Sequence, residues 1–361
     1  MAANLSLGTA YQHYGGIQAI FQQRGVGGLT SQLSRSILYE YRPIDVSVSF
    51  RLFCFHEISA YNLQICFCLL DRRASFLSRS AWLNLRCLLQ DAQVVGPLQR
   101  LLDIAYLVPP IIEQFDSIRT QGSDGSSPPE SAPKKRRPST QNMLSQLLCS
   151  THSVWSELQT WEAGLQNHDE SVQLYISRFS SWSNASRDQE EEVYGKIIAV
   201  SCSFPSFELG VALIYKAAVE IFVVELMADL KQDIGDRLGG MPVSAAASLN
   251  DVGKVDDAVE SIVAGTPTED MLSRSIEDLN QMALDSARRI CSAFEYFFEE
   301  DKKRTGRMVA LFPFETAYRT FKKHASDGDG NDCRRELLFC EMVNEKLHSE
   351  GIPTNFQPSS T

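Results

Sequence analysis

Apolar residues recur along this chain at intervals of three and four positions, the spacing that places side chains on one face of an α-helix. One such stripe runs through residues 101–108 and ends at Pro109-Pro110; it consists of Leu101, Ile104, Ala105 and Val108. A second stripe consists of Leu144, Leu147, Leu148, Trp155, Leu158, Trp161 and Leu165. Both segments are predicted to be amphipathic helices.

Residues 211–226 carry a wider apolar face, and Phe204-Pro205 just before them is typical of a helix entrance. We predict that this helix lies at the centre of the core. Its charged residues, Lys216, Glu220 and Glu225, argue against a membrane span and are expected on a solvent-facing side of the helix. Residues 50–70 are also strongly apolar but contain charged and amide side chains, so the sequence predicts no membrane-spanning segment.

Further helices are expected towards the C-terminus. One apolar stripe consists of Met282, Ala283, Ala287, Ile290, Ala293, Phe294 and Phe297, and residues 314–321 and 336–347 follow it with helical spacing. The chain shows no pattern typical of a β-hairpin. About nine to twelve consecutive helices with short connections predict an all-α fold, a multi-helix bundle or α-α array with a disordered linker.

The predicted linker is residues 121–140, QGSDGSSPPESAPKKRRPST, where Ser, Pro, Gly and charged residues replace every large apolar residue. Such a segment buries too little apolar surface to offset the entropy lost on ordering. It divides the chain into an N-terminal helical part, residues 1–120, and a C-terminal helical part, residues 141–361. Residues 235–268, rich in Gly, Ala, Ser and Asp, are expected to form a second loop.

The formal net charge of the 361-residue chain is -11. Because this charge repels phosphate backbones, we expect no direct DNA binding by this chain. The nine cysteines are an odd number and follow no secretory signal peptide, which indicates reduced thiols in a cytosolic or nuclear protein. The spacing of Cys333 and Cys340 suits one face of a helix, so core packing explains them most simply.

No residue pattern in the sequence matches the common catalytic motifs for phosphate binding, dinucleotide binding, acyl transfer or zinc proteolysis. The six histidines are far apart, and the glycines at 15–16 and 25–28 are expected at helix ends and turns. Residues 327–331 resemble the start of a calcium loop, but Asp332 and Leu338 stand where that loop needs Gly and Glu. We therefore predict no catalytic residues, no metal site and no cofactor, and hence no enzymatic activity.

One short motif has a credible function. Lys134, Lys135, Arg136 and Arg137 lie between Pro133 and Pro138 inside the predicted linker. Four contiguous cations in extended backbone suit the acidic groove of a nuclear import receptor, so they are a candidate nuclear localisation signal. The alternative is a charge run that only keeps the linker soluble.

Five blocks together resemble the C-terminal regulatory region of the fungal six-cysteine zinc-cluster transcription factors. They are HYGGIQAIFQQRG (residues 13–25), LLDRRASFLSRSAW (69–82), LLDIAYLVPPIIEQFDSIR (101–119), FEYFFEEDKKRTGRMVALFPFETAYRTF (294–321) and CRRELLFCEMVNEKLHSEGIP (333–353). The fourth resembles an apolar helix, an acidic and polar turn, and an L-F-P block that leads into the next helix. The fifth is similar to the family's terminal helix and G-I-P stop.

The resemblance implies a nuclear, helical domain that controls an attached DNA-binding module, in some members in response to metabolites or partner proteins. Partners would be the transcription machinery or other regulators, with a homodimer as a further option. The family's C-x2-C-x6-C array is absent from this sequence. We expect either that the gene model starts too late or that the chain is a truncated paralogue that acts through partners. A C-x2-C-x6-C array encoded upstream of Met1 would decide between a regulatory domain of this family and a helical module that acts on transcription only through another protein.

Two other classes of function stay open at this point. The first is a helical protein-interaction or ligand-sensing module that acts on transcription only through another protein. The second is an enzyme with a helical active-site cavity, similar to a terpene cyclase. That class needs clustered acidic metal ligands, and no D-D-x-x-D-like run occurs in the sequence.

Replacement of Lys134, Lys135, Arg136 and Arg137 by Ala is expected to abolish nuclear accumulation of a fluorescent fusion too large to diffuse through nuclear pores. The physical reason is the loss of the concentrated positive charge that an acidic receptor groove would bind. Fluorescence microscopy of living cells measures the outcome. Unchanged nuclear accumulation would remove this role.

Residues 46–64, VSVSFRLFCFHEISAYNLQ, separate two stretches that stand almost adjacent in the family, and without them the chain reads YRPIDICFCLLDRRASFL. They correspond to 19 codons, or 57 nucleotides, so their removal keeps the reading frame. Val46-Ser47 can be encoded by a splice-donor sequence, Gln64 by an acceptor, and Ala60-Tyr61 can contain a branch-site-like sequence. We predict that the segment is a translated, retained intron.

Sequencing of transcripts across this region tests the prediction. Mature messages that lack the 57 nucleotides are the expected result. Messages that uniformly retain them, or genomic codons without GT and AG ends, would make the segment a genuine insertion.

Overall fold

The computed structural model of the chain describes residues 23, 25, 68–74, 96–123, 140–167, 176–179, 200–237, 271–326 and 333–352. Within them the elements follow in the order α5 (Pro97–Ala105), α6 (Val108–Ser123), α7 (Thr140–Asn167), β1 (Ile176–Phe179), β2 (Val200–Ser203), α9 (Phe207–Arg237), α10 (Ile276–Phe298), α11 (Lys303–Ser326) and α12 (Arg334–Ser349). The predicted all-α class is confirmed for this part of the chain.

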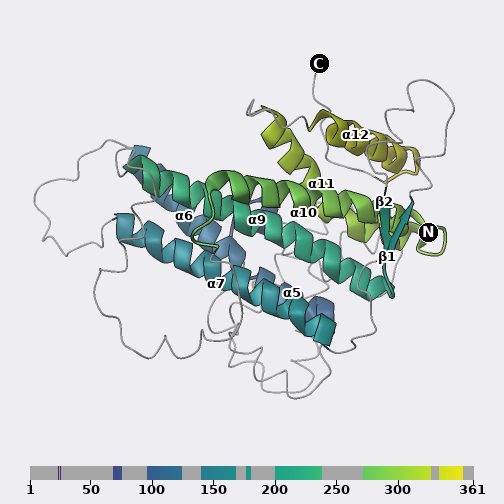
Figure 1. The fold of residues 1–361 in the computed structure, drawn as a ribbon, viewed down its shortest axis with the longest axis horizontal. Coiled ribbons are helices and arrows are strands. Elements are labelled where there is room, and N and C mark those ends of the chain that lie inside the picture. Colours follow the sequence, from purple (N-terminus) through teal and green to yellow (C-terminus); the bar gives the residue numbers. More distant parts are fainter. Residues whose placement is uncertain are drawn as a thin grey trace, which may run out of the picture.

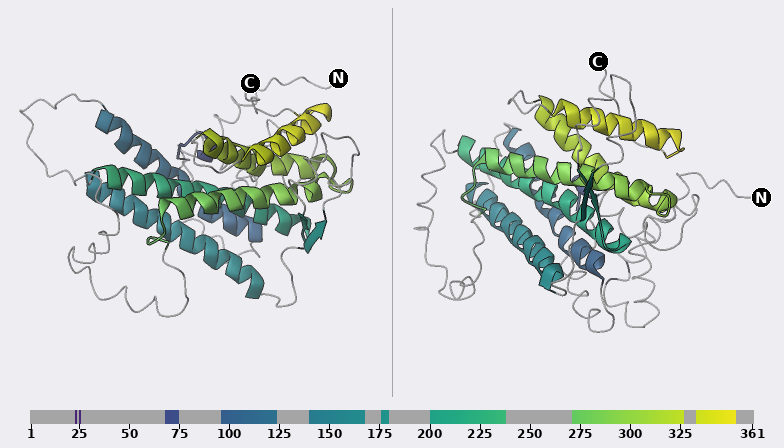
Figure 2. Two further views of the ribbon diagram at one scale, coloured as in Figure 1. Left: turned by 45° about the horizontal axis from the view of Figure 1, so that its top comes forward. Right: turned by 45° about the vertical axis from the view of Figure 1, so that its right-hand side comes forward.

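The helices form a layered array around α9 and α10, which lie side by side (Figure 1). Helices α5, α6 and α7 pack on one side of this pair, and α11 packs against both α9 and α10. Helix α12 lies on α11 at the outer edge, as the two further views agree (Figure 2). Elements from both sides of the predicted linker therefore share one core.

The apolar stripes identified in the sequence face this core. All four residues of the first stripe are buried in α5 or at the start of α6, and α5 begins with Pro97 in its first turn, where a missing N–H costs no hydrogen bond. In α7, Leu144, Leu158 and Trp161 are buried, and the Trp161 indole Nε1–H donates to the carbonyl of Pro97 at 3.0 Å. This bond joins the two helices.

Helix α9 is the centre of the core, as predicted, because almost every side chain from Val211 to Ala228 is buried. Helix α10 begins with a capping box: the amide of Asp278 donates to Ser275 Oγ, and the amide of Ser275 donates to the Asp278 carboxylate, both at 3.0 Å. The contact between the two central helices is thus largely apolar, and the start of α10 is fixed by its capping box.

Aromatic rings fill the space between α9, α10 and α11. The rings of Phe294 and Phe314 have centroids 4.7 Å apart, and those of Tyr215 and Phe312 are 5.5 Å apart. Contacts of this kind add to the burial of the rings themselves. They hold α11 against both central helices.

The start of α11 differs from the expectation that a helix would follow the L-F-P block. The helix begins at Lys303 and contains Pro313 in its interior. A proline there lacks one backbone hydrogen bond, but its fixed φ angle is helical. Burial of the neighbouring Val309, Phe312 and Phe314 offsets the lost bond.

A small antiparallel ladder, which the sequence pattern did not reveal, pairs β1 with β2 in the register Ile176–Ser203 to Phe179–Val200. Strand β2 packs on α10, where the Ser292 hydroxyl donates to the sulfur of Cys202 at 3.4 Å. The ladder is short and its strands are distant in sequence, so the sequence contains neither a tight-turn signal nor a long alternating pattern that would predict it.

The boundaries of several predicted segments differ from those in the structure. Helix α6 continues to Ser123 and α7 begins at Thr140, so both ends of the expected linker are helical, and α9 extends through residues 235–237. Gly25, just after the helical Gln23, has φ +59°, which confirms a helix-end turn there. Residues 46–64, 124–139 and 327–331 lie outside the described residues. In the described part, no helix has the length and apolar character that a membrane span requires.

Gly306 permits the close approach of α11 to α10, since a Cβ at this position would overlap the carbonyl oxygen of Phe297. Gly306→Ala is expected to lower the free energy of unfolding by about 1–3 kcal/mol, although Ala is the better helix former. Gly164→Ala in α7 is the matched control, because nothing lies within 4 Å of its added Cβ. It should raise stability by about 0.5–1 kcal/mol. Urea denaturation measures both, and stabilisation by both substitutions would contradict the packing described here.

Candidate functional site

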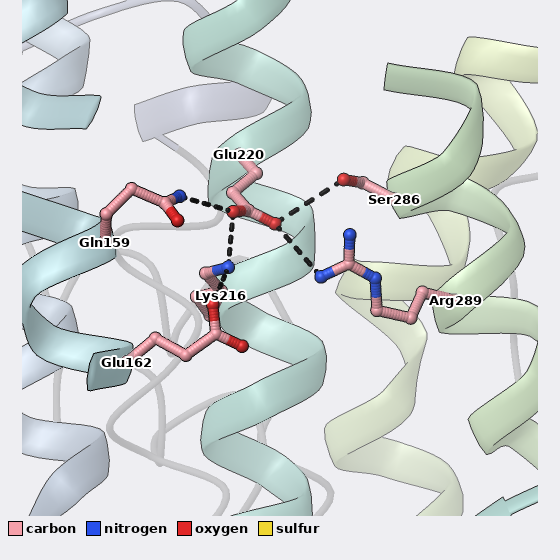
Figure 3. Close-up of polar contacts among 6 residues, drawn as sticks. All are labelled: Gln159, Glu162, Lys216, Glu220, Ser286 and Arg289. Carbon is pink, nitrogen blue, oxygen red and sulfur yellow. Dashed lines mark hydrogen bonds and ion pairs between the residues drawn. The ribbon is translucent and has the colours of Figure 1, made fainter. Parts of the chain in front are cut away.

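A cluster of charged side chains lies inside the molecule where α7, α9 and α10 meet (Figure 3). Lys216 and Glu220, one turn apart on α9, have side chains only 2% and 3% exposed. The expectation that these charges face solvent is wrong. They are enclosed because α9 is covered on all sides, so even its polar positions face neighbouring helices.

The Lys216 ammonium is shared between two carboxylates. It forms an ion pair with Glu220 on its own helix and a second one with Glu162 on α7, whose Oε2 lies 2.6 Å from Nζ. The interior has a low effective dielectric, so these interactions are stronger than at the surface, and the loss of one partner is correspondingly costly.

The two oxygens of Glu220 have different partners (Figure 3). Oε1 contacts Lys216 and accepts a hydrogen bond from Gln159 Nε2 at 3.1 Å. Oε2 lies 3.4 Å from the hydroxyl of Ser286 and 3.6 Å from Nη1 of Arg289, both on α10. Glu220 therefore links α7 to α10 through polar contacts on both of its oxygens.

The formal charges within the cluster balance, because Glu162 and Glu220 are opposed by Lys216 and Arg289. The cations differ in burial: Lys216 is enclosed, whereas the Arg289 side chain is 39% exposed. Arg289 is thus the more accessible of the two cations, and the Glu162 side chain is also partly exposed, at 18%.

A cavity of about 110 Å³ opens beside Glu220. Its lining residues come from α7, α9 and α10 and are Trp155, Glu220, Val224, Met282, Asp285, Ser286 and Arg289. The lining combines carboxylate, hydroxyl and guanidinium groups with an indole, a valine side chain and a thioether. This mixture suits a small molecule with one charged group and a short apolar part.

The third charge expected at the surface, Glu225, lies further along α9 and is partly buried. Burial raises the pKa of its carboxyl above the ordinary value, against the opposing effect of Lys323, whose ammonium lies 3.7 Å away. Glu225 thus belongs to the contact between α9 and α11 rather than to a wet face.

A second hollow, an open groove of about 570 Å³, lies where β2 enters α9 and α10 turns into α11. The ammonium of Lys302 occupies its edge, 4.2 Å from the centre of the Tyr296 ring and 2.5 and 2.8 Å from the carboxylates of Glu299 and Asp301. Burial acts to lower the pKa of Lys302, but these carboxylates raise it above its ordinary value. One cation that lines the groove is therefore already paired with two carboxylates of the same turn.

The described histidines, which the sequence analysis considered as metal ligands, lie on different helices. His152, His324 and His348 lie on α7, α11 and α12, and the described residues contain no group of three His, Cys, Asp or Glu side chains arranged to hold a metal. Cys333 and Cys340 are buried, which confirms their place in the core, and burial with the neighbouring Cys291 raises the pKa of the Cys340 thiol. The candidate localisation signal, Lys134, Lys135, Arg136 and Arg137, lies outside the described residues.

The comparison with known proteins adds no identification. No model of a known protein family, no curated protein and no solved structure matches this chain.

Lys216→Met is expected to lower the free energy of unfolding by about 3–5 kcal/mol, because it leaves Glu162 and Glu220 without their shared cation inside the core. The matched control is Arg319→Met on α11, which removes a cation from an exposed ion pair of the same one-turn spacing, with Glu315. That loss should be less than about 1 kcal/mol. Urea denaturation followed by circular dichroism measures both losses. Equal losses of unfolding free energy would mean that the buried cluster stabilises the fold no more than an exposed ion pair does.

Proposed function

We propose that this chain is the regulatory domain of a nuclear transcription factor of the fungal zinc-cluster type, acting through the transcription machinery or partner regulators. The observation that carries the proposal is the contact between two of the family-like blocks, residues 69–82 and 101–119. The Arg72 guanidinium donates two hydrogen bonds of 2.8 Å to the carboxylate of Asp116 on α6. The amide of Ala74 donates to Glu113 at 3.3 Å.

Arg72 also has an unusual backbone conformation, with φ +55°, which is uncommon for a residue other than glycine. It ends a short helical turn, where the amide of Arg73 donates to the carbonyl of Cys68 at 2.9 Å. A strained backbone of this kind persists when surrounding contacts hold it, and here the bidentate pair with Asp116 does so. Arg72, the first arginine of this block, thus has a structural role, which supports its place in a family motif.

The two C-terminal blocks support the proposal in the same way. Residues 294–321 span the end of α10, the turn with Lys302, and most of α11, and the ring of Phe312 packs on Tyr215 and Phe222 of α9. Residues 333–353 include α12, which packs on α11. The described parts of four blocks, residues 69–74, 101–119, 294–321 and 333–352, therefore contribute to one core, which supports a single domain.

We propose no catalytic role and no direct DNA binding for this chain, the latter because of its net charge of -11. The second candidate is a helical ligand-sensing or protein-interaction module that reaches transcription through another protein. The cavity beside Glu220 favours ligand sensing over interaction alone, since it lies where three helices meet.

The proposal is tested by fusing the chain to an unrelated DNA-binding domain and measuring transcription of a reporter gene that carries its binding site. The fusion is expected to change reporter output several-fold relative to the DNA-binding domain alone. The same fusion with Lys216→Met, which disturbs the core, should lose the effect at equal protein level. Reporter output indistinguishable from the DNA-binding domain alone would contradict a regulatory role.

A further inference from the structure

The open groove of about 570 Å³, at the end of the array marked by β1 and β2 in Figure 1, is lined by a buried tyrosine with an unused hydroxyl. Tyr296 is only 6% exposed, and its ring lies 5.1 Å from that of Phe204 between centroids and 4.2 Å from the Lys302 ammonium. No residue of the described part of the chain forms a hydrogen bond with its hydroxyl. Since the hydroxyl of a buried tyrosine usually has a partner, this one is available to a ligand in the groove.

Two further hydroxyl groups of the groove have an unused donor. The Ser206 hydroxyl accepts from the amide of Leu209 at 3.2 Å, but no described residue accepts its own proton. The Thr305 hydroxyl also lacks a hydrogen bond to the described residues. Burial raises the pKa of Tyr296 above its ordinary value, so its hydroxyl stays protonated and can donate as well. The groove therefore offers O–H donors, which suit the backbone carbonyl groups of a peptide.

The acidic edge of the groove has an unused acceptor. Lys302 donates to Oε2 of Glu299 at 2.5 Å and to the two oxygens of Asp301 at 2.9 and 2.8 Å. Oε1 of Glu299 has no partner among the described residues, and this side chain is 40% exposed. The lining thus contains two carboxylates and one cation. A positively charged side chain of a ligand can pair with Glu299 while Lys302 keeps its place.

Apolar side chains at the entrance of α9 complete the lining. Pro205 is exposed and Phe207 is half-buried. Grooves lined by aromatic rings bind proline-rich segments, which are already extended and so lose little conformational entropy on binding. Such segments carry carbonyl acceptors but few N–H donors, which matches the O–H donors of this groove. Its volume of about 570 Å³ lies within the range of roughly 300–1,000 Å³ typical of ligand sites.

We propose that this groove binds a short, extended, proline-containing peptide segment of a partner protein, and that the segment carries an arginine or a lysine. Its backbone carbonyls accept from Tyr296, Thr305 and Ser206. Its proline ring lies on Phe207, and its cation pairs with Glu299. The inference rests on the groove alone, so binding by the purified chain stands whether or not the reporter fusion changes transcription.

The test titrates the full chain with the synthetic peptide Ac-Ala-Pro-Pro-Arg-NH2 in isothermal titration calorimetry. Tyr296→Phe, which removes only the hydroxyl, is expected to weaken binding about three- to tenfold. It should leave the free energy of unfolding unchanged, because that hydroxyl has no hydrogen bond within the described part of the chain. Tyr318→Phe is the matched control, since Tyr318 is equally buried but does not line the groove. It should leave the affinity unchanged.

The choice of peptide tests the charge and the proline. Wild type should bind the arginine peptide several-fold more tightly than the same peptide with norleucine in place of arginine, or with alanine in place of both prolines. Glu299→Gln should abolish the preference for arginine. Asp301 still pairs with Lys302 in this variant, so it is expected to stay folded, which circular dichroism checks.

Three results would overturn the proposal. The first is wild type that binds the arginine peptide no better than its norleucine or proline-free counterpart. The second is wild-type affinity in Tyr296→Phe, and the third is an undiminished preference for arginine in Glu299→Gln. Self-association of the chain that Tyr296→Phe abolishes, measured by analytical ultracentrifugation, would assign the groove to a second copy and would also overturn it.

Discussion

The positive charge of Lys216 is enclosed at the centre of the molecule, and the placement of α7 and α10 on α9 depends on how that charge is neutralised. One carboxylate comes from α9 itself and the other from α7, and Glu220 then carries the contact on to α10. Removal of one partner from a buried ion pair is strongly destabilising, whereas replacement of the whole pair by apolar residues is often neutral. The cluster therefore contributes chiefly to which faces of the three helices meet, while apolar burial provides the bulk of the stability.

A second buried lysine on the same helix is neutralised differently. The Lys231 ammonium, in a residue only 6% exposed, donates to the backbone carbonyls of Leu272 and Arg274, at the turn that precedes α10. Thus α9 positions α10 twice, once at the start through Lys231 and once in the middle through Glu220. Aromatic packing completes the contact at the far end, where the ring centres of Phe207 on α9 and Phe297 on α10 lie 5.9 Å apart. Three different kinds of interaction fix one helix pair along its length.

The sequence predicts the helices well and the polar centre poorly, for a physical reason. Apolar spacing identifies α5, α7 and α10 because a helix that is covered on one side needs only one apolar stripe, and the wider apolar face of α9 identifies it as the central helix. Lys216 and Glu220 are one turn apart, a spacing that is equally suited to an exposed ion pair. The available signal was the all-round apolar character of residues 211–228, which implies that any charge among them is enclosed. The partners Glu162, Ser286 and Arg289 come from distant segments, and no local pattern brings them to Glu220.

Native-state hydrogen exchange resolved by segment tests the central claim most directly, because it reports the free energy at which each helix opens. If the shared charge joins the three helices, the interior amides of α7, α9 and α10 exchange only through one common unfolding event and have the same free energy of opening. Exchange of the α7 amides at a much lower free energy, while α9 and α10 stay protected, would show that α7 is held independently of the buried charges and would contradict the account.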